Sequence, residues 1–210
     1  NVTGVQTCAL PILPLEGAAN FRDLGGYGTS DGRSVRWHTV FRSDSLSALT
    51  DADHQRLRAL GVKLVCDLRL PGERRHAPNI LPDALGIERF EPGFIPRGTL
   101  DMLAQIRAGT LHGTDIIEHV KTHYWHMPRD HAGVFGSVLR RLADTRPAVV
   151  HCTSGKDRTG LTAAFLLLAL GVPVEAVYED YLLTNKYRRD VTRLLDLPAN
   201  AEDMAIQIGR

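Results

Sequence analysis

The sequence predicts an α/β fold with a central, mostly parallel sheet flanked by helices. Short apolar runs of strand length alternate along the chain with segments whose apolar residues recur at helical spacing. The run 62–68 is apolar apart from one lysine and one aspartate, as expected for a parallel strand buried on both faces. A strand, a tight loop and a helix are expected in that order over 148–170, which is a typical unit of such folds.

The composition is that of one globular domain. Of 210 residues, 43% are hydrophobic and 23% are charged, and the net charge of +1 does not favour nucleic acid as a partner. The longest apolar run, 161–174, is too short to cross a bilayer and contains a glycine and a proline, so we expect no stable membrane insertion. The cysteines are too widely spaced for a disulfide framework or a metal site.

The N-terminal segment is excluded from the expected fold. Residues 2–12 are identical to the in-frame translation of a common short-read sequencing adapter, and we interpret 1–12 as an artefact of sequence assembly. Residues 13–210 are then expected to form a single domain that is truncated at its C-terminus. We expect a cytoplasmic protein, but secretion stays open because an export signal would have been lost with the native start.

The first half of the chain is expected to form a hairpin, strands and a helix. Asp31-Gly32 is a hairpin turn signal, and 33–42 alternates as a strand does. Thr50 is the expected N-cap of a helix over 51–60, with an aspartate three residues later as a capping-box variant. The buried strand described above follows this helix.

The second half adds a helical insertion and the helices that flank the loop. A short strand within 88–96 leads to helices at 99–108 and 114–125, which we expect to form a cap or insertion at about 97–130. The later elements are expected as helix, strand, helix, helix and helix at 131–143, 148–151, 161–170, 175–183 and 186–195. The helix 161–170 is apolar nearly all round, so we expect it to be buried.

The strand that ends at His151 leads into a loop that opens with Cys152 and closes with Arg158. The residues between them are small, polar or cationic, so the loop amides can point inward at the N-terminus of the next helix. Such a ring of amides binds anions, and the helix dipole and the Arg158 guanidinium strengthen that binding. Because the same surroundings acidify a thiol, we expect Cys152 to be a nucleophile that faces a bound phosphate.

The rest of the loop has expected roles in holding a phosphoryl group. The Thr159 hydroxyl would donate to the Cys152 sulfur or cap the helix, and Lys156 is either a second cation at the pocket rim or a solvated lysine. We expect His151 to support the loop rather than to act as a base. The expected phosphate-binding residues are Thr153, Ser154, Gly155, Lys156, Arg158, Thr159 and Gly160.

The motif His-Cys-x-x-Gly-Lys-Asp-Arg-Thr-Gly at 151–160 resembles the loop of the atypical bacterial protein tyrosine phosphatases that also act on phosphoserine, phosphothreonine and phosphoinositides. The resemblance implies a protein-tyrosine-phosphatase-like fold, a cysteinyl-phosphate intermediate, a phosphorylated protein or phosphoinositide as substrate, and no cofactor. It extends over about 16–190 through the segments Asn20–Tyr27, Phe41–Ser43, Cys66–Arg69 with Glu73, and Asp180–Asn185.

The general acid is the one part of the expected site that departs from the family pattern. Asp157 could protonate the leaving group, and the resemblance favours that role over a purely structural pairing with Arg158. Some relatives place an aspartate in the loop after the strand near 88–92, where this chain has Glu91 and no aspartate. Glu91 or the more distant Asp101 is the expected substitute; without an acid, catalysis would favour phenolic leaving groups.

Asp67 and Arg69 follow the buried strand at its carboxyl end. Ligands of open α/β sheets bind beside such ends, so the two residues could lie at the rim of the Cys152 pocket. The alternative is an internal ion pair that only fixes the loop. The same choice arises for Arg22 and Asp23, and there we expect a structural role.

Three histidines could bind zinc but lack the usual partners. His119, His123 and His126 are spaced four and then three residues apart on an expected helix. No cysteine or glutamate completes a known zinc motif, so we expect a solvated polar face and no metal site.

Two other functions are consistent with a cysteine at the start of an anion-binding loop. Rhodanese-like sulfurtransferases have such a loop, although theirs usually lack the Arg-Thr-Gly exit found at 158–160. A catalytically inactive phosphate-binding module is the second alternative, and the intact Cys152 and Arg158 argue against it. We therefore predict an enzyme, a tyrosine or dual-specificity phosphatase that works without metal.

Overall fold

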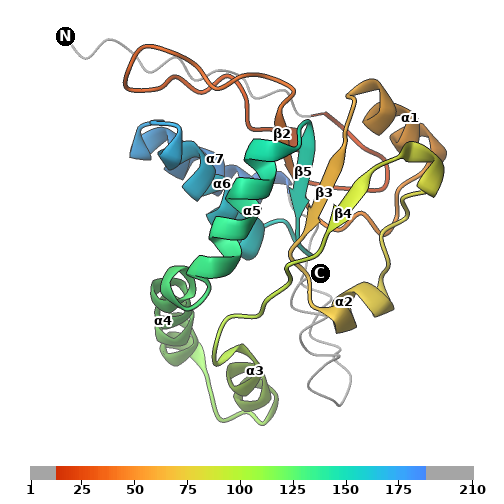
Figure 1. The fold of residues 1–210 in the computed structure, drawn as a ribbon. Coiled ribbons are helices and arrows are strands. Elements are labelled where there is room, and N and C mark those ends of the chain that lie inside the picture. The colour runs from red at the N-terminus through yellow and green to blue at the C-terminus, as the bar shows by residue number, and fades with distance from the viewer. Residues whose placement is uncertain (1–12, 188–210) are drawn as a thin grey trace.

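The computed structural model describes residues 13–187, which form a five-stranded sheet with helices on both faces (Figure 1). Within this sheet, β1 runs antiparallel to β2 and every other neighbouring pair is parallel, which confirms the predicted fold class. In spatial order the strands are β1 (Arg22–Asp23), β2 (Val40–Ser43), β5 (Ala148–His151), β3 (Leu64–Asp67) and β4 (Glu88–Phe90).

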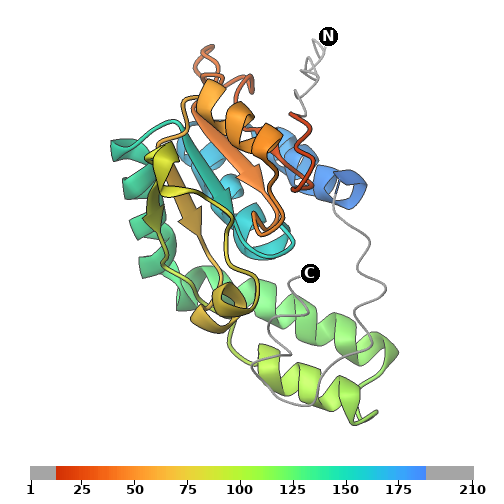
Figure 2. The same cartoon turned by 90° about the vertical axis from the view of Figure 1, so that its right-hand side faces the viewer.

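The helices divide between the two faces of the sheet and a separate pair (Figures 1 and 2). α5, α6 and α7 cover one face and α1 covers the other. The helices are α1 (Asp51–Ala59), α2 (Pro71–His76), the short 3-10 helix η1 (Asp83–Leu85), α3 (Thr99–Arg107), α4 (Gly113–Asp130), α5 (Ala132–Asp144), α6 (Asp157–Ala169) and α7 (Val174–Tyr187). Over residues 13–187, none of them is both long enough and apolar enough to cross a bilayer.

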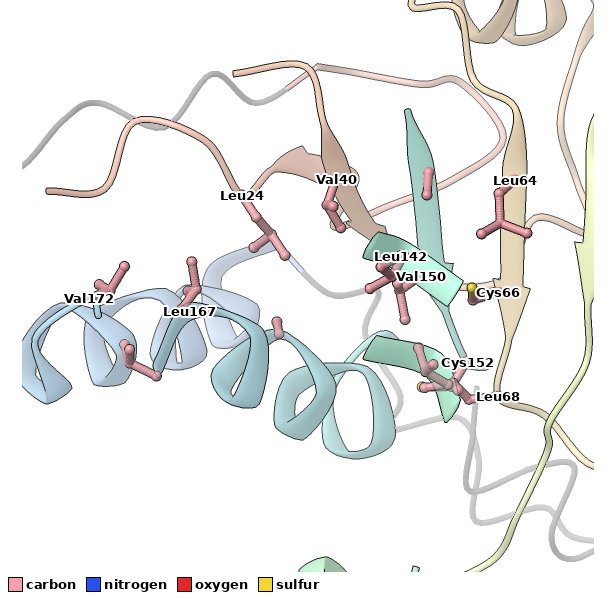
Figure 3. Packing of buried hydrophobic residues seen from close by; sticks show 14 of the residues in the cluster. Leu24, Val40, Leu64, Cys66, Leu68, Leu142, Val150, Cys152, Leu167 and Val172 are labelled. Atoms are coloured by element: carbon pink, nitrogen blue, oxygen red, sulfur yellow. The ribbon is translucent and has the colours of Figure 1, made fainter. Parts of the chain in front are cut away.

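Alternate residues of the central strands face two separate cores. On β5, Val150 packs in the cluster under α5 and α6 (Figure 3), whereas Val149 packs in the cluster under α1. β3 alternates in the same way, with Cys66 on the first side and Val65 on the second. Because side chains of a strand point alternately to opposite faces, an uninterrupted apolar run is what a sheet covered on both faces requires.

The register of the sheet brings three strand ends together. Ser43 of β2 and Asp67 of β3 are both paired with His151 of β5, so the segments that follow these strands leave from one edge. Cys152 is the next residue after β5. The carboxyl edge of the sheet therefore holds the predicted anion-binding loop, as expected for a parallel α/β sheet.

The helices α3 and α4 lie beyond this carboxyl edge, where Figure 2 shows them as a pair below the strands. They share a small apolar cluster that includes Met102 and Leu111. α4 is attached to the rest of the molecule by Met127, which packs with Phe94 and Phe135. The two helices coincide with the insertion expected at about 97–130.

Several element boundaries differ from the sequence-based expectations. The strand expected over 33–42 is only β2, because the preceding residues form the hairpin around 28–34 and turns. α2 was not expected, since its six residues carry no apolar periodicity. Thr50 does cap α1: its hydroxyl accepts the Asp53 amide at 3.3 Å, and the Asp53 carboxylate accepts the Thr50 amide at 3.1 Å.

The expectation for the helix at 161–170 was wrong in two respects. α6 begins earlier, at Asp157, because the end of the loop is already helical. It is not buried all round, since Leu168 and Leu170 at its C-terminal end are 44% and 45% exposed. The helix expected at 186–195 and the segment 1–12 lie largely or wholly outside the described residues.

Candidate active site

The loop from Cys152 to Arg158 is shaped by a glycine that no other residue could replace without strain. Gly155 has a φ of +65°, and a Cβ atom there would lie 2.5 Å from the Ser43 carbonyl oxygen. A left-handed residue and a close backbone approach are both needed for the chain to turn from β5 into α6. The loop therefore curls against β2, and Cys152 is left 2% exposed at its start.

The Arg158 guanidinium is held by a buried glutamate. Its Nη1 and Nη2 atoms donate to the two carboxylate oxygens of Glu73 at 2.8 and 2.7 Å, and Nη1 also donates to the carbonyl oxygens of Leu68 and Phe94. The Thr153 hydroxyl donates to the same carboxylate at 2.5 Å. A fork-to-fork pair of this kind fixes the plane of the guanidinium as well as its position.

The pKa values of Glu73 and Arg158 are shifted in the directions that favour the charged form of each group. Burial alone would raise the pKa of Glu73, but the hydrogen bonds and charge of Arg158 outweigh it and hold that pKa below its ordinary value of 4.5. Burial would likewise lower the pKa of Arg158, and the Glu73 carboxylate raises it instead. Both groups are therefore ionised at neutral pH.

A buried network supports the loop from behind. The Gly155 carbonyl oxygen accepts hydrogen bonds from Arg42 Nη2 at 2.8 Å and from Asn20 Nδ2 at 3.1 Å. Arg42 is in turn bound to Asp180 at 2.6 Å, and Arg22 Nε is bound to the same carboxylate at 3.1 Å. These side chains come from the segment before β1 and from β1, β2 and α7, so the segments of the N- and C-terminal regions that resemble the family meet under the loop.

The network consists of buried charged side chains, each of which is stabilised by an oppositely charged partner. Burial and the neighbouring Arg42 lower the pKa of Arg22 to about 10, although Asp180 acts in the opposite direction. Burial would raise the pKa of Asp180, but the two arginines hold it below its ordinary value. Asp23 accepts the backbone amides of Gly25 and His38 at 2.8 and 2.7 Å, so the structural role expected of Arg22 and Asp23 is what the structure shows.

Asp67 and Arg69 lie inside the molecule and not at the rim of the pocket. They are 1% and 0% exposed, and Arg69 Nη2 donates to Asp67 at 2.7 Å. Arg69 also donates to the Ala77 carbonyl oxygen and to Asn79. The expectation of a pocket rim is corrected to its alternative, an internal ion pair, because every oxygen of Asp67 is already bonded to a neighbouring side chain or amide.

His151 links this ion pair to the loop. Its ring contacts the Cys152 carbonyl oxygen through Nδ1 at 3.0 Å and Asn79 Nδ2 through Nε2 at 3.1 Å. Burial lowers the pKa of His151, which favours a neutral ring that donates from Nδ1 and accepts at Nε2. The histidine thus supports the backbone of the loop, as expected, and Asp67 lies 3.5 Å from it.

A cavity of about 190 Å³ opens over Cys152 and Arg158. Its floor is the loop, with Ser154, Lys156 and Asp157 among the lining residues, and its side includes Glu73. Its walls come from the segment before α3 and from both inserted helices, through Ile95, Pro96, Thr99, Met102, Val120, His123, Tyr124 and Met127. A small charged floor under largely apolar walls would orient a phosphoryl group toward the cysteine.

Asp157 is the acid candidate that lies in the cavity. It is in the first turn of α6, its side chain is 36% exposed, and Lys156 Nζ lies 3.6 Å from its carboxylate. Glu91 does not line the cavity and is paired with Arg74 at 3.2 Å. Asp101 lies on the exposed side of α3, away from the lining. Glu91 and Asp101, the two alternatives considered for the general acid, are therefore not positioned to protonate a leaving group in the cavity.

Thr159 and Gly160 follow the loop inside α6. The Thr159 hydroxyl is fully buried and has no hydrogen-bond partner in the part of the chain that is described, so the bond expected to the Cys152 sulfur is not formed. Lys156, not Thr159, occupies the N-cap position. A Cβ atom at Gly160 would lie 2.5 Å from the ring of Tyr181, so this glycine allows α7 to approach α6.

His123 was missed as a lining residue. It lies on α4 with Val120 three residues before it and Met127 four residues after it, and this spacing places all three on one helical face. That pattern in the sequence could have identified it as an inward-facing residue. Between residues 13 and 187, no group of three or more histidine, cysteine, aspartate or glutamate side chains is arranged to hold a metal ion.

Comparison with protein families assigns the chain to one family. The model of the tyrosine phosphatase family matches residues 13–207. The chain belongs to this family. The resemblance inferred from the loop motif is thereby confirmed at the level of the family.

Individual relatives agree with the assignment. A protein of Cupriavidus necator, named as a tyrosine-protein phosphatase, is 33% identical over 179 residues, which are 83% of this chain and 63% of the relative. The triple specificity protein phosphatase PtpB of Mycobacterium tuberculosis is 29% identical over 84% of this chain and 70% of its own. The chain thus spans about two thirds of the length of these relatives.

Solved structures are more distant from this chain. TpbA of P. aeruginosa is 17% identical, with 93% of this chain and 91% of that chain covered and a TM-score of 0.43.

Proposed function

We propose that this tyrosine phosphatase family member hydrolyses phosphate monoesters through a cysteinyl-phosphate intermediate. Phosphotyrosine is the first substrate, and phosphoserine, phosphothreonine and phosphoinositides extend the range, as the resemblance of the loop motif implies. One relative is named as a triple specificity protein phosphatase, which is in line with a broad range. The observation that carries the proposal is the shared cavity of Cys152 and Arg158, with the guanidinium fixed by Glu73.

The first step transfers the phosphoryl group to sulfur. The Cys152 thiolate attacks phosphorus in line, the S–P bond forms, and the P–O bond to the leaving group breaks. Charge in this loose transition state lies on the non-bridging oxygens. We expect the amides of the loop and the Arg158 guanidinium to stabilise that charge, each donor being worth about 3 kcal/mol.

Arg158 keeps donors free for this task. A guanidinium has five N–H groups in a fixed fork, and the contacts with Glu73, Leu68 and Phe94 involve only Nη1 and one direction of Nη2. Within the described residues 13–187, the Nε–H and the second Nη2–H have no hydrogen-bond acceptor, so they remain for two phosphoryl oxygens. Glu73 thus positions the arginine without competing for the edge that faces the substrate.

The second step regenerates the free enzyme. Water attacks the cysteinyl phosphate, inorganic phosphate leaves, and the thiolate is regenerated. Asp157 is the proposed acid that gives a proton to the leaving oxygen in the first step and takes one from water in the second. It lines the cavity, whereas Glu91 and Asp101 do not.

The test compares an aryl phosphate with an alkyl phosphate. Cys152→Ser is expected to abolish turnover of both, and vanadate is expected to inhibit the wild-type protein. Asp157→Asn is expected to slow the alkyl substrate by about a hundredfold and the aryl substrate much less, because a phenolate leaves without full protonation. Glu91→Gln and Asp101→Asn are matched controls that should change neither rate.

Three results would contradict the proposal. One is turnover that survives in Cys152→Ser. Another is an equal loss on both substrates in Asp157→Asn, which would remove this residue as the acid. The third is thiosulfate turnover without phosphatase activity, which would favour the sulfurtransferase alternative.

A further inference from the structure

The structure contains a second cavity, larger than the first, that the proposed reaction does not use. It has a volume of about 290 Å³ and shares no lining residue with the cavity over Cys152. Four elements enclose it: the hairpin after β1, the start of β2, the last turns of α5 and the last turns of α6. Its lining residues are Leu24, Thr29, Arg33, Ser34, Val35, Arg36, Thr39, Val40, Leu139, Leu142, Ala143, Arg146, Leu166 and Leu170.

The floor of this cavity is apolar and continuous with the core. Leu24, Val40 and Leu142, which are labelled in Figure 3, are 1%, 7% and 2% exposed and belong to the main buried cluster. Leu166 packs against the same cluster, and Leu170 at the end of α6 is 45% exposed. An apolar ligand in the cavity would therefore extend an existing core.

The walls are held together by hydrogen bonds between segments. The Gly26 amide donates to the Val35 carbonyl oxygen at 2.8 Å and the Val35 amide to the Tyr27 carbonyl oxygen at 2.8 Å, which closes the hairpin. The Ser30 amide donates to the Gly171 carbonyl oxygen at 2.8 Å, which ties the hairpin tip to the end of α6. The cavity is thus bounded by connected elements and does not need a further segment to form it.

The rim of the cavity is cationic. Arg33, Arg36 and Arg146 line it, and no aspartate or glutamate is among the described residues that do so. Arg33 is paired with Asp31 at 2.6 Å, whereas Arg36 and Arg146 are exposed and have no carboxylate partner within the described part of the chain. Two guanidinium groups therefore remain for an anion.

Helix ends offset only part of this positive charge. The C-terminal ends of α5 and α6 lie at the cavity, and each contributes about half a negative charge. Together they offset about one of the two charges of Arg36 and Arg146. The rim keeps a net positive charge above an apolar floor.

We propose that this cavity binds an anionic amphiphile, a molecule with a carboxylate or phosphate head and a short alkyl tail. The head would accept hydrogen bonds from Arg36 and Arg146, whose forks match both kinds of oxyanion. The tail would lie on Leu24, Val40 and Leu142. We refer to this cavity as the rear groove.

The test measures binding of decanoate by titration calorimetry, below the concentration at which it forms micelles. Decyl phosphate is measured in the same way but with saturating vanadate in the Cys152 cavity, because an alkyl phosphate is also a substrate of the proposed reaction. Both are expected to bind saturably, while decanol binds more weakly and decyltrimethylammonium does not bind. Arg36→Gln and Arg146→Gln are expected to weaken binding about fivefold each, and the double variant about twenty-five-fold. Arg140→Gln is the matched control, because Arg140 is an exposed arginine on α5 that does not line the groove.

The proposal stands or falls independently of the phosphatase reaction. Cys152→Ser should bind decanoate as tightly as the wild-type protein, and vanadate should not displace decanoate. Equal loss of affinity in Arg140→Gln, equal binding of the cationic amphiphile, or competition of vanadate with decanoate would overturn the proposal. So would binding to phosphatidylglycerol vesicles without uptake of monomeric decanoate, which would indicate a surface patch, and so would arginine variants that lower the Tm but bind normally.

Discussion

Glu73 connects three parts of the site through one carboxylate. It binds both terminal nitrogens of Arg158, accepts the Thr153 hydroxyl and accepts the Leu70 amide at 2.7 Å. Nothing in its sequence neighbourhood indicates this role except the resemblance to the family, because Thr153 and Arg158 lie 80 and 85 residues away. A buried carboxylate with four donors is a positioning group for the arginine.

Glu73→Gln tests this positioning. The amide keeps the size of the side chain but removes its charge and one acceptor oxygen, so the guanidinium loses its fork-to-fork partner. We expect kcat/KM for an aryl phosphate to fall about tenfold to a hundredfold. Glu91→Gln makes the same chemical change in an exposed ion pair outside the cavity and should leave kcat/KM unchanged; a similar fall in both variants would contradict the role of Glu73.

The shifted pKa of Glu73 also predicts that the free energy of unfolding depends on pH. The pKa of Glu73 is lower in the folded protein than its ordinary value of 4.5, because Arg158 outweighs the effect of burial. Its contribution to the free energy of unfolding is therefore complete above about pH 4.5 and is lost as the pH falls through the folded pKa. Urea unfolding of wild type and Glu73→Gln between pH 7 and 3 measures it: the difference between the two should shrink below about pH 4.5, and a difference that grows on acidification would contradict the assignment.

At the scale of elements, the turn from β5 into α6 determines where the nucleophile lies. The loop can curl only because Gly155 adopts a left-handed conformation against the Ser43 carbonyl oxygen. Its own carbonyl oxygen is then available to Arg42 and Asn20. The loop shape thus depends on its support from β2 as much as on its own sequence.

Gly155→Ala and Gly61→Ala form a matched pair for this claim. Both glycines have a φ of +65°, but a Cβ atom at Gly61 would meet nothing within 4 Å. Gly61→Ala should lower the free energy of unfolding by about 1–2 kcal/mol and leave activity intact. Gly155→Ala should in addition reduce kcat/KM at least about a hundredfold, since the loop must move away from β2; equal kinetics in the two variants would show that the close approach is not needed.

At the scale of the whole molecule, the sequence predicted the order and type of most elements. The mostly parallel sheet, the strand before the loop and the N-cap at Thr50 follow from local patterns, and all are present. α2 was missed because its six residues, mostly polar, carry no apolar period. The strand that became β2 was expected to start too early, because alternation persists through the turns that precede it.

The site was predicted less completely than the fold, for a physical reason. Cys152, Arg158 and Asp157 lie in one short segment, so their common location follows from chain connectivity. Asp67 and Arg69 were ambiguous, because a strand end can face either a pocket or the interior. The contacts of Arg42 with Asp180 and with the loop join residues far apart in the chain, and a single sequence contains no signal for such pairs.

Trapping the intermediate tests the account most directly. The wild-type protein would be quenched with acid during turnover of an aryl phosphate, digested, and measured by mass spectrometry beside Cys152→Ser. We predict one added phosphoryl group on the peptide that contains Cys152 in the wild-type protein, and neither adduct nor turnover in the variant. A phosphoryl group on another residue, or turnover by Cys152→Ser, would contradict it.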